Sequence, residues 1–479
     1  MAKQPMLKFV KIDRDMPEKR VAETRREDFH EIYAEYADAK AKEQASRCSQ
    51  CGVPYCQSHC PLHNNIPDWL RLTAEGRLRE AYEISQATNT FPEICGRICP
   101  QDRLCEGNCV IEQSGHGTVT IGSVEKYITD TAWENGWVKP GTPTSERTES
   151  VGIIGAGPGG LAAADVLRRA GLQVTVYDRY DRAGGLLTYG IPGFKLEKDV
   201  VMRRNEQLEQ AGVKFVQNCD VDAEKFASIR AEHDAIIVAT GVYKSRELGG
   251  PQVIADGIEK AIDYLTASNR KSFGDDVPEF DSGRLDAKGK RVVVIGGGDT
   301  AMDCVRTAIR QGAESVKCLY RRDRANMPGS QREVTNAEEE GVIFEWLTAP
   351  KGFVESDGRV TGVNVQRMRL GAPDVTGRQA PELIEGSDYV EDADIAIKAL
   401  GFEPEDLPTL WGEPALQVTR WGTIKAEFTT GKTELDGVYA VGDIVRGASL
   451  VVWAIRDGRD CAEAILEQLG KGATAIAAE

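Results

Sequence analysis

The sequence predicts an α/β protein in which a helical, cysteine-rich N-terminal domain precedes two Rossmann-like nucleotide-binding domains, the second inserted in the first. Three observations lead to this fold class. Eight of the twelve cysteines lie between Cys48 and Cys109. A strand, a glycine turn, a helix and a second strand follow one another from Val151, and the same order recurs from Arg291. The 479 residues suffice for about three domains of roughly 150 residues.

The domain boundaries follow from changes in composition. Residues 139–150 are polar and contain proline, as a linker does. Residues 20–46 are charged and predict a solvated amphipathic helix. The apolar residues from Leu70 to Ile84 recur at approximately helical spacing. We therefore expect a helical domain over 1–145, the first nucleotide-binding domain over 146–255 and 399–479, and the inserted domain over 256–398.

The net charge of -16 argues against nucleic acid as a partner, because phosphate binding needs a basic surface. The N-terminus lacks the apolar stretch of a signal peptide, and no run approaches the ~18 apolar residues of a membrane span. We expect a cytoplasmic protein that does not contact membranes. Its clustered cysteines then favour metal binding over disulfides.

The first βαβ unit carries a dinucleotide-binding pattern. Its turn reads G-x-G-x-x-G, with Gly155, Gly157 and Gly160, and Pro158 follows the second glycine. The first glycine allows the tight turn, the second lets a pyrophosphate approach the helix N-terminus, and the third lets helix pack on strand. Asp178 ends the second strand, where an acid binds an adenosine ribose.

The second unit has the turn G-x-G-x-x-A, with Gly296, Gly298 and Ala301. Its second strand ends at Arg321-Arg322 in place of an acid. Arginine at this position suits the 2′-phosphate of NADP. The alternative is that these arginines form a solvated basic patch.

Two later strands end in small or acidic residues. One ends in Ala239-Thr240-Gly241, and another ends at Gly442-Asp443 just before a helix, where an acid suits the sugar-phosphate side of a flavin. A nicotinamide transfers hydride, whereas a flavin also passes single electrons to a metal centre. The cofactors then carry the chemistry, so we expect no catalytic acid–base pair.

The cysteine spacing favours iron–sulfur clusters. The first group reads C-x2-C-x4-C-x3-C-P, two residues longer in the middle than a ferredoxin run. In that run the fourth cysteine binds the other cluster, so Cys60 should serve a different cluster from Cys48, Cys51 and Cys56. Zinc, with His59 or His63, and disulfides are the alternatives.

The remaining cysteines, Cys219, Cys304, Cys318 and Cys461, are scattered in apolar contexts and are expected to be buried structural residues. A flavin disulfide reductase would need a redox cysteine pair soon after the flavin-binding strand. The segment 184–198 occupies that region without a cysteine.

Several stretches resemble the small-subunit family of bacterial NADPH-dependent glutamate synthase and, more distantly, dihydropyrimidine dehydrogenase and adrenodoxin-reductase-like flavoproteins. They are SRCSQCGVPYCQSHCP, FPEICGRICPQDRLCEGNC, GLLTYGIPGFKLEK, GGGDTAMDC, IKALGFEPE and GDIVRGASLVVWAIRDGRD. The resemblance implies that NADPH reduces FAD and that two 4Fe-4S clusters pass electrons to a large subunit. That subunit carries FMN, makes glutamate from glutamine and 2-oxoglutarate, and forms a hetero-oligomer with this chain.

Two alternatives stay open at this point. The same module could serve a pyrimidine-reducing or electron-bifurcating partner, or the chain could be a metal-stabilised scaffold with inactive nucleotide folds.

The resemblance also implies ligand sets for the clusters. One cluster takes Cys48, Cys51, Cys56 and Cys109. The other takes Cys60, Cys99 and Cys105, with a fourth ligand that is glutamine in dihydropyrimidine dehydrogenase. The matching position here is Glu125, and Cys95 is its rival.

Further cofactor contacts follow from the resemblance. For FAD they are the first glycine turn, Asp178, Gly185, Leu186, Gly190, Thr240, Gly442, Asp443, Ser449, Leu450 and Val451. For NADPH they are Gly296, Gly298, Asp299, Thr300, Ala301, Arg321 and Arg322, with Gly401 and Phe402 bordering the nicotinamide.

Overall fold

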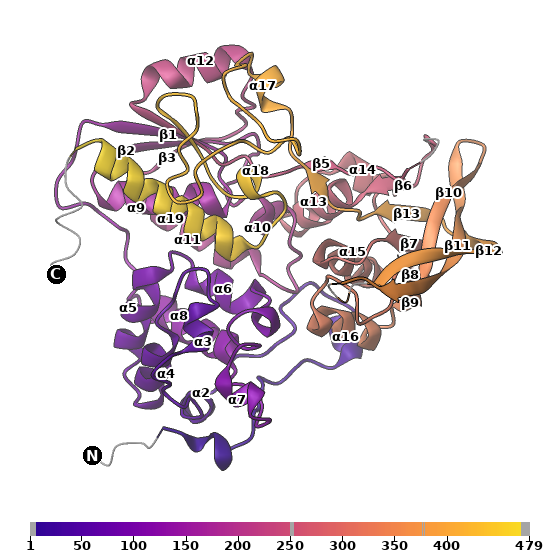
Figure 1. Ribbon diagram of the computed structural model, residues 1–479, viewed down its shortest axis with the longest axis horizontal. Coiled ribbons are helices and arrows are strands. Elements are labelled where there is room, and N and C mark those ends of the chain that lie inside the picture. The colour runs from indigo at the N-terminus through magenta and orange to yellow at the C-terminus, as the bar shows by residue number, and fades with distance from the viewer. Residues whose placement is uncertain (1–5, 250–252, 376, 378, 471–479) are drawn as a thin grey trace.

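A computed structural model describes residues 6–249, 253–375, 377 and 379–470 (Figure 1). The N-terminal part is helical and lies against the first nucleotide-binding domain, with the inserted domain to one side. Its α-helices are α1 (Ala22–Arg25), α2 (Asp38–Ala45), α3 (Tyr55–Ser58), α4 (Ile66–Ala74), α5 (Leu78–Thr88), α6 (Pro92–Ile98), α7 (Val110–Gln113) and α8 (Ile121–Glu134). Two 3-10 turns, Lys8–Val10 and Gln101–Arg103, complete it.

The prediction of one solvated helix over residues 20–46 is wrong. Only α1 and α2 are helical, and the chain between them forms tertiary contacts instead. Ile32 donates its backbone N–H to the carbonyl of Phe194, and the buried Arg25 pairs with Glu339 and Glu340 of the inserted domain. Similarly, the stripe from Leu70 to Ile84 spans two helices, α4 and α5, because Gly76 adopts a positive φ of 77° between them.

The first nucleotide-binding domain is a parallel five-stranded sheet in the order β15-β4-β1-β2-β3. Its strands are β1 (Ser150–Ile154), β2 (Gln173–Tyr177), β3 (Lys214–Val216), β4 (Ala235–Val238) and β15 (Val438–Ala440). Its helices are α9 (Pro158–Arg169), α10 (Leu186–Tyr189), α11 (Lys198–Gln210), α12 (Ala223–Glu232), α17 (Leu407–Leu410), α18 (Asp443–Arg446) and α19 (Val451–Gln468). Because β15 comes from the C-terminal part of the chain, the expected insertion of the second domain in the first is confirmed.

The inserted domain has its own parallel sheet, in the order β6-β13-β7-β8-β9. The strands are β6 (Ile258–Lys260), β7 (Arg291–Ile295), β8 (Ser315–Tyr320), β9 (Ile343–Trp346) and β13 (Ile395–Lys398), with helices α13 (Ala261–Ser272), α14 (Pro278–Asp281), α15 (Asp299–Arg310) and α16 (Gln331–Glu339). An antiparallel sheet of β10 (Thr348–Ser356), β11 (Arg359–Pro373) and β12 (Gln379–Asp392) extends from one edge of this domain (Figure 1). That sheet was not among the expected elements.

The two connections between the nucleotide-binding domains run side by side. β5 (Lys244–Ser245) belongs to the outgoing connection and β14 (Phe402–Glu403) to the returning one, and they pair as a short antiparallel ribbon. The chain therefore enters and leaves the inserted domain at one place. The domain boundaries stated above stay predictions.

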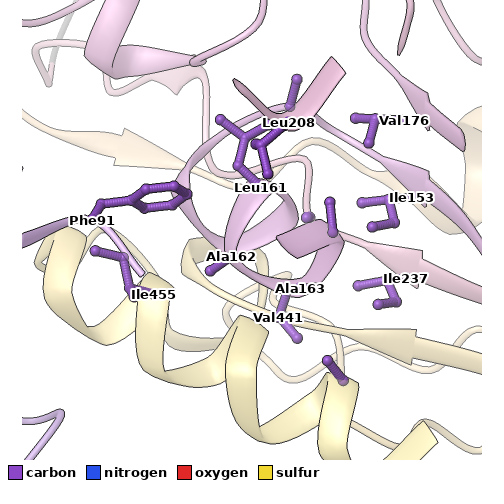
Figure 2. Packing of buried hydrophobic residues seen from close by; sticks show 14 of the residues in the cluster. Phe91, Ile153, Leu161, Ala162, Ala163, Val176, Leu208, Ile237, Val441 and Ile455 are labelled. Carbon is purple, nitrogen blue, oxygen red and sulfur yellow. The ribbon is translucent and has the colours of Figure 1, made fainter. Parts of the chain in front are cut away.

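The helical domain and the first nucleotide-binding domain share a hydrophobic core. Phe91, which precedes α6, is buried in one cluster with Leu161 and Ala162 of α9 and Ile455 of α19 (Figure 2). Helices α9 and α19 approach closely, since a Cβ on Gly458 would lie 2.1 Å from the carbonyl oxygen of Gly159. No helix in the described part of the chain is both long and apolar enough to cross a membrane.

Candidate functional site

A cavity of about 500 Å³ lies where the two nucleotide-binding domains and the helical domain meet. Its walls come from the glycine turn before α9, the N-terminus of α15, the segment 96–100 and the N-terminus of α19. Of the residues predicted to bind FAD, those on the wall are Gly155, Gly157, Pro158, Asp178, Leu186, Thr240, Gly442, Asp443, Ser449, Leu450 and Val451. The structure thus brings segments far apart in the sequence to one cavity.

The first glycine turn has the geometry that a bound dinucleotide requires. Gly155 has a φ of 111°, and a Cβ there would lie 2.3 Å from the carbonyl oxygen of Ala239. Gly157 has no atom within 4 Å of such a Cβ, so its backbone faces open space at the N-terminus of α9. A Cβ on Gly160 would lie 2.1 Å from the oxygen of Gly155, which makes Gly160 a packing residue.

Gly185 and Gly190 are also predicted to contact FAD, but they do not line the cavity and lie behind its wall. A Cβ on Gly185 would come within 2.9 Å of the Cα of Gly157, and one on Gly190 within 2.9 Å of the Leu186 side chain. Both glycines therefore allow close packing around the turn rather than facing the cavity.

The acid at the end of β2 is held by the backbone. Asp178 Oδ2 accepts from the N–H of Ala156 at 2.6 Å, and Oδ1 accepts from the N–H of Tyr180 at 2.8 Å. Burial raises the pKa of Asp178 above its usual range. The carboxylate is thereby fixed on the cavity wall beside the glycine turn, as a ribose-binding acid must be.

Two further polar residues, Thr240 and Asp443, line this cavity after β4 and β15. Thr240 Oγ1 is buried and makes no hydrogen bond to any residue that the structure describes. Asp443 follows the positive-φ Gly442, and burial raises its pKa to about 6. A buried hydroxyl without a partner normally requires a ligand or water, so this wall fits a polar cofactor.

The second glycine turn repeats the first. A Cβ on Gly296 would lie 2.2 Å from the oxygen of Ala399, Gly298 is open to space, and Ala301 is buried. Asp299 and Thr300 line the cavity. Arg321 and Arg322 follow β8 and do not line the cavity, and neither forms an ion pair with another residue in the described ranges. Gly401 has a φ of 94° before β14 and also lies off the wall.

The two cysteine groups exchange members. One small cavity is lined by Cys48, Cys51, Cys56 and Cys109, and another by Cys60, Cys95, Cys99 and Cys105 with Glu125. Cys60 thus joins the second group and Cys109 the first, which is the arrangement the resemblance implied. All twelve cysteines are free of disulfides. Among the residues described, no three His, Cys, Asp or Glu side chains are grouped as the ligands of a single metal ion would be, so the cluster ligand sets stay predictions.

Glu125 and Cys95 both reach the second cysteine cavity. Glu125 Oε1 accepts from the amides of Asn64 at 3.1 Å and Asn89 at 3.4 Å, and burial raises its pKa to about 8. The Cys95 thiol donates to Asn89 Oδ1 at 3.8 Å. The choice between them as the fourth ligand therefore stays a prediction. His59 and His63 are exposed, away from both cavities.

The three cavities form a row. Cys99 lines both the large cavity and the second cysteine cavity, and Ile121 lines both cysteine cavities. Helix α19 contributes Leu450 and Val451 to the first wall and Val452 to the second. The cavity lined by Cys60, Cys99 and Cys105 is consequently the one next to the nucleotide-binding cavity.

Sequence reasoning missed several residues on the large cavity's wall, among them Tyr33, Tyr180, Lys195, Tyr243 and Arg332. Tyr180 could have been found, since it follows Asp178 by two residues at a strand end. Cys219 also lines this cavity and is only half-buried, so its prediction as a buried structural residue is wrong. Cys304, Cys318 and Cys461 are buried as predicted.

Two family models match the sequence. Residues 25–137 match dihydropyrimidine dehydrogenase domain II, 4Fe-4S cluster, and residues 149–458 match pyridine nucleotide-disulphide oxidoreductase. The chain is 66% identical over 466 residues to the glutamate synthase (NADPH) small chain of Azospirillum brasilense, covering 97% of this chain and 96% of that protein. The protein of that name from Escherichia coli is 45% identical over 471 residues, with 97% and 99% covered.

Among solved structures, the chain is similar to FprA from Mycobacterium tuberculosis in complex with NADPH, with a TM-score of 0.55 and 20% identity. The match covers 68% of this chain and 85% of that one. At this identity the similarity shows the fold alone.

Lys198 supports the loop that carries Leu186 and Ile191 to the cavity. Its ammonium is buried and donates to the carbonyls of Leu187 and Ile191, at 3.1 Å for Leu187. No ion pair links it to a carboxylate among the described residues. Burial therefore lowers the pKa of Lys198 to about 7.

We predict that Lys198 makes stability depend on pH. Between pH 7 and the unfolded pKa of 10.5, the unfolded chain binds more protons, so the free energy of unfolding should rise with pH. From pH 7 to 9, the wild type should gain about 2 kcal/mol relative to Lys198→Met. Urea unfolding of both proteins at each pH measures this difference. Lys288→Met, at an exposed position, is the matched control; equal slopes in all three proteins would contradict the prediction.

Proposed function

From the premise that this chain belongs to the family of glutamate synthase (NADPH) small chains, we propose that it delivers electrons from NADPH to a large subunit that carries FMN and makes L-glutamate from L-glutamine and 2-oxoglutarate. The chain is an NADPH-dependent oxidoreductase with FAD and 4Fe-4S cofactors. When bound, NADPH would supply hydride, FAD would convert it to single electrons, and the 4Fe-4S clusters would pass these on. The chain's own residues bind and align these groups, so no catalytic acid–base pair is needed.

For FAD, the support is the wall around the first glycine turn. Gly157 is open to space and suits the diphosphate, and Asp178, held by two backbone N–H groups, suits the ribose. The Thr240 hydroxyl, which has no partner among the described residues, suits a polar edge of the cofactor. The cavity is also lined by Ser449, Leu450 and Val451, at the N-terminus of α19. A helix N-terminus stabilises negative charge, which suits a flavin that becomes reduced.

For NADPH, the support is the second glycine turn and its arginines. Gly298 is open at the N-terminus of α15, where the diphosphate of a dinucleotide belongs. Arg321 and Arg322 stand where the first unit has its acid, and arginine pairs with a 2′-phosphate. Gly401 and Phe402 are proposed to border the nicotinamide.

For the clusters, the support is the pair of cysteine cavities. One cluster is proposed to bind Cys48, Cys51, Cys56 and Cys109, and the other Cys60, Cys99, Cys105 and Glu125. The shared Cys99 favours the second cluster as the one that receives electrons from the flavin. We propose a cytoplasmic location, because cluster thiolates persist under reducing conditions.

We predict that the purified chain, with flavin and clusters, reduces an artificial electron acceptor with NADPH. It should make no glutamate from glutamine and 2-oxoglutarate until a large subunit is added. Flavin absorbance that bleaches with NADPH measures the first step, and amino-acid analysis measures the product. Glutamate formed by the isolated chain, or co-purification with a partner that has no glutamine-hydrolysing activity, would contradict the proposed role. A flavin that NADPH does not bleach would instead favour an inactive scaffold.

We predict that Arg321 and Arg322 select NADPH over NADH. The double variant Arg321→Gln/Arg322→Gln should lose about 10²- to 10⁴-fold in kcat/KM with NADPH, because it removes two charge-assisted hydrogen bonds and each costs about 1.5–3 kcal/mol. Activity with NADH should change little. Arg369→Gln, an exposed arginine paired with Glu382, is the control. Equal losses with both coenzymes would show that these arginines do not bind the 2′-phosphate.

We predict that Glu125, rather than Cys95, completes the second cluster. Glu125→Ala should lose about half of the iron and sulfide, since two 4Fe-4S clusters hold equal amounts, and should lose one EPR signal of the reduced protein. Cys95→Ala should keep both. Glu125→Gln restores an amide like that of dihydropyrimidine dehydrogenase and should retain iron. The reverse pattern, with loss in Cys95→Ala alone, would make Cys95 the ligand.

A further inference from the structure

One cationic side chain on the wall of the large cavity differs from the others. The lysines and arginines that line it are Arg97, Lys126, Arg179, Lys195 and Arg332. Four of them pair with carboxylates: Arg97 and Lys126 with Glu31, Arg179 with Glu405, and Lys195 with Asp303. Within the described ranges, the half-buried Arg332 has no such ion pair.

The Arg332 guanidinium has an N–H donor without a partner among the described residues. Its Nη2 donates to Gln101 Oε1 at 3.1 Å, whereas its Nε is buried without a hydrogen-bond partner among the described residues. The neighbouring Glu333 carboxylate forms its ion pair with Arg306 and, with Glu106 and Asp102, stabilises the Arg332 charge without a direct contact. Ser330 Oγ, two residues away on the same wall, is also buried without a partner.

The segment that carries these unpartnered donors is bonded to the second glycine turn. The N–H of Ser330 donates to Asp299 Oδ1 at 2.9 Å, and the N–H of Gly329 donates to the carbonyl of Gly297 at 2.9 Å. The start of α16 is thereby tied to the N-terminus of α15. Arg332 and Ser330 thus lie on one wall with Asp299 and Thr300, where that helix N-terminus favours negative charge.

The cysteine-rich domain fixes the direction of the Arg332 side chain. The Gln101 amide donates through Nε2 to the carbonyls of Cys95 at 3.1 Å and Gly96 at 3.3 Å, so its oxygen is left to face Arg332. Arg103, in the same 3-10 turn, donates to the carbonyl of Pro328 at 2.8 Å and lies 3.4 Å from Asp299. The 3-10 turn Gln101–Arg103, which lies between Cys99 and Cys105, therefore holds residues 328–332 in place.

We propose that Arg332 binds the diphosphate of NADPH, with Ser330 as a neighbouring donor, and that Gln101 is a positioning residue that holds the guanidinium in place. An arginine fork suits phosphate oxygens, and its charge complements the N-terminus of α15. The nicotinamide-nucleotide site is then completed by the cysteine-rich domain. This inference rests on the proposed function in that its ligand is NADPH.

The test compares two ligands on the holoprotein. NADP⁺ contains the diphosphate, whereas 2′,5′-ADP keeps the 2′-phosphate and a single 5′-phosphate but lacks the nicotinamide half. Arg332→Gln should weaken NADP⁺ binding about 10- to 100-fold, the loss of one charge-assisted hydrogen bond. It should weaken 2′,5′-ADP binding much less. Calorimetry gives both dissociation constants, and flavin and iron content verify that the protein is intact.

Three further variants complete the test. Arg332→Lys keeps the charge without the fork and should fall between wild type and Arg332→Gln. Gln101→Leu, if it keeps its iron, should weaken NADP⁺ binding less than Arg332→Gln does. Arg324→Gln, on the same loop but paired with Glu338, is the control and should bind like wild type.

An unchanged NADP⁺ dissociation constant in Arg332→Gln would overturn the proposal, and so would an equal loss with both ligands. Failure of the proposed function has a different signature. In that case wild-type holoprotein would neither bind NADP⁺ nor be bleached by NADPH.

Discussion

The docking of helix α6 on the first nucleotide-binding domain is the constraint on which the electron path depends. Glu93 of α6 forms a buried bidentate ion pair with Arg204 of α11, at 2.7 and 2.9 Å. Arg97 of the same helix pairs with Glu31 and Asp130. Removing one partner from a buried pair typically costs about 3–5 kcal/mol. Because Cys99 ends this helix and borders both cavities, these pairs set how the cysteine cavity faces the nucleotide cavity.

The two nucleotide-binding domains show how one backbone motif acquires two specificities. In both, the first glycine approaches a neighbouring strand end, Ala239 or Ala399, and the second is open to solvent space. What differs lies at the end of the second strand, Asp178 in one and Arg321-Arg322 in the other. The motif provides an open helix N-terminus in both domains, and the side chains after the second strand are the ones proposed to distinguish the two nucleotides.

Local patterns predicted the parallel sheets, the glycine turns and the exchange of Cys60 into the second group, because each depends on residues close in sequence or on fixed spacing. Contacts between distant segments were not predictable. The segment 20–46 is charged like an exposed helix, yet Arg25 and Ile32 are held by residues more than a hundred positions away. Register shifts interrupt both strand pairings of the β10–β12 sheet, although β11 alternates buried and exposed residues. Arg332 carries no motif, and its relevance appears only once Gln101 is seen beside it.

The paired connections at β5 and β14 have a consequence for how such a protein can change over evolutionary time. Since the chain leaves and re-enters the first sheet's domain through two neighbouring strands, the whole inserted segment behaves as a module with adjacent ends. Modules of that kind can be gained, lost or exchanged without breaking the host's strand order. The inserted domain, which is proposed to bind NADPH, can thus be exchanged as a unit. The flavin-binding and cluster-binding portions share one core and have to be inherited together.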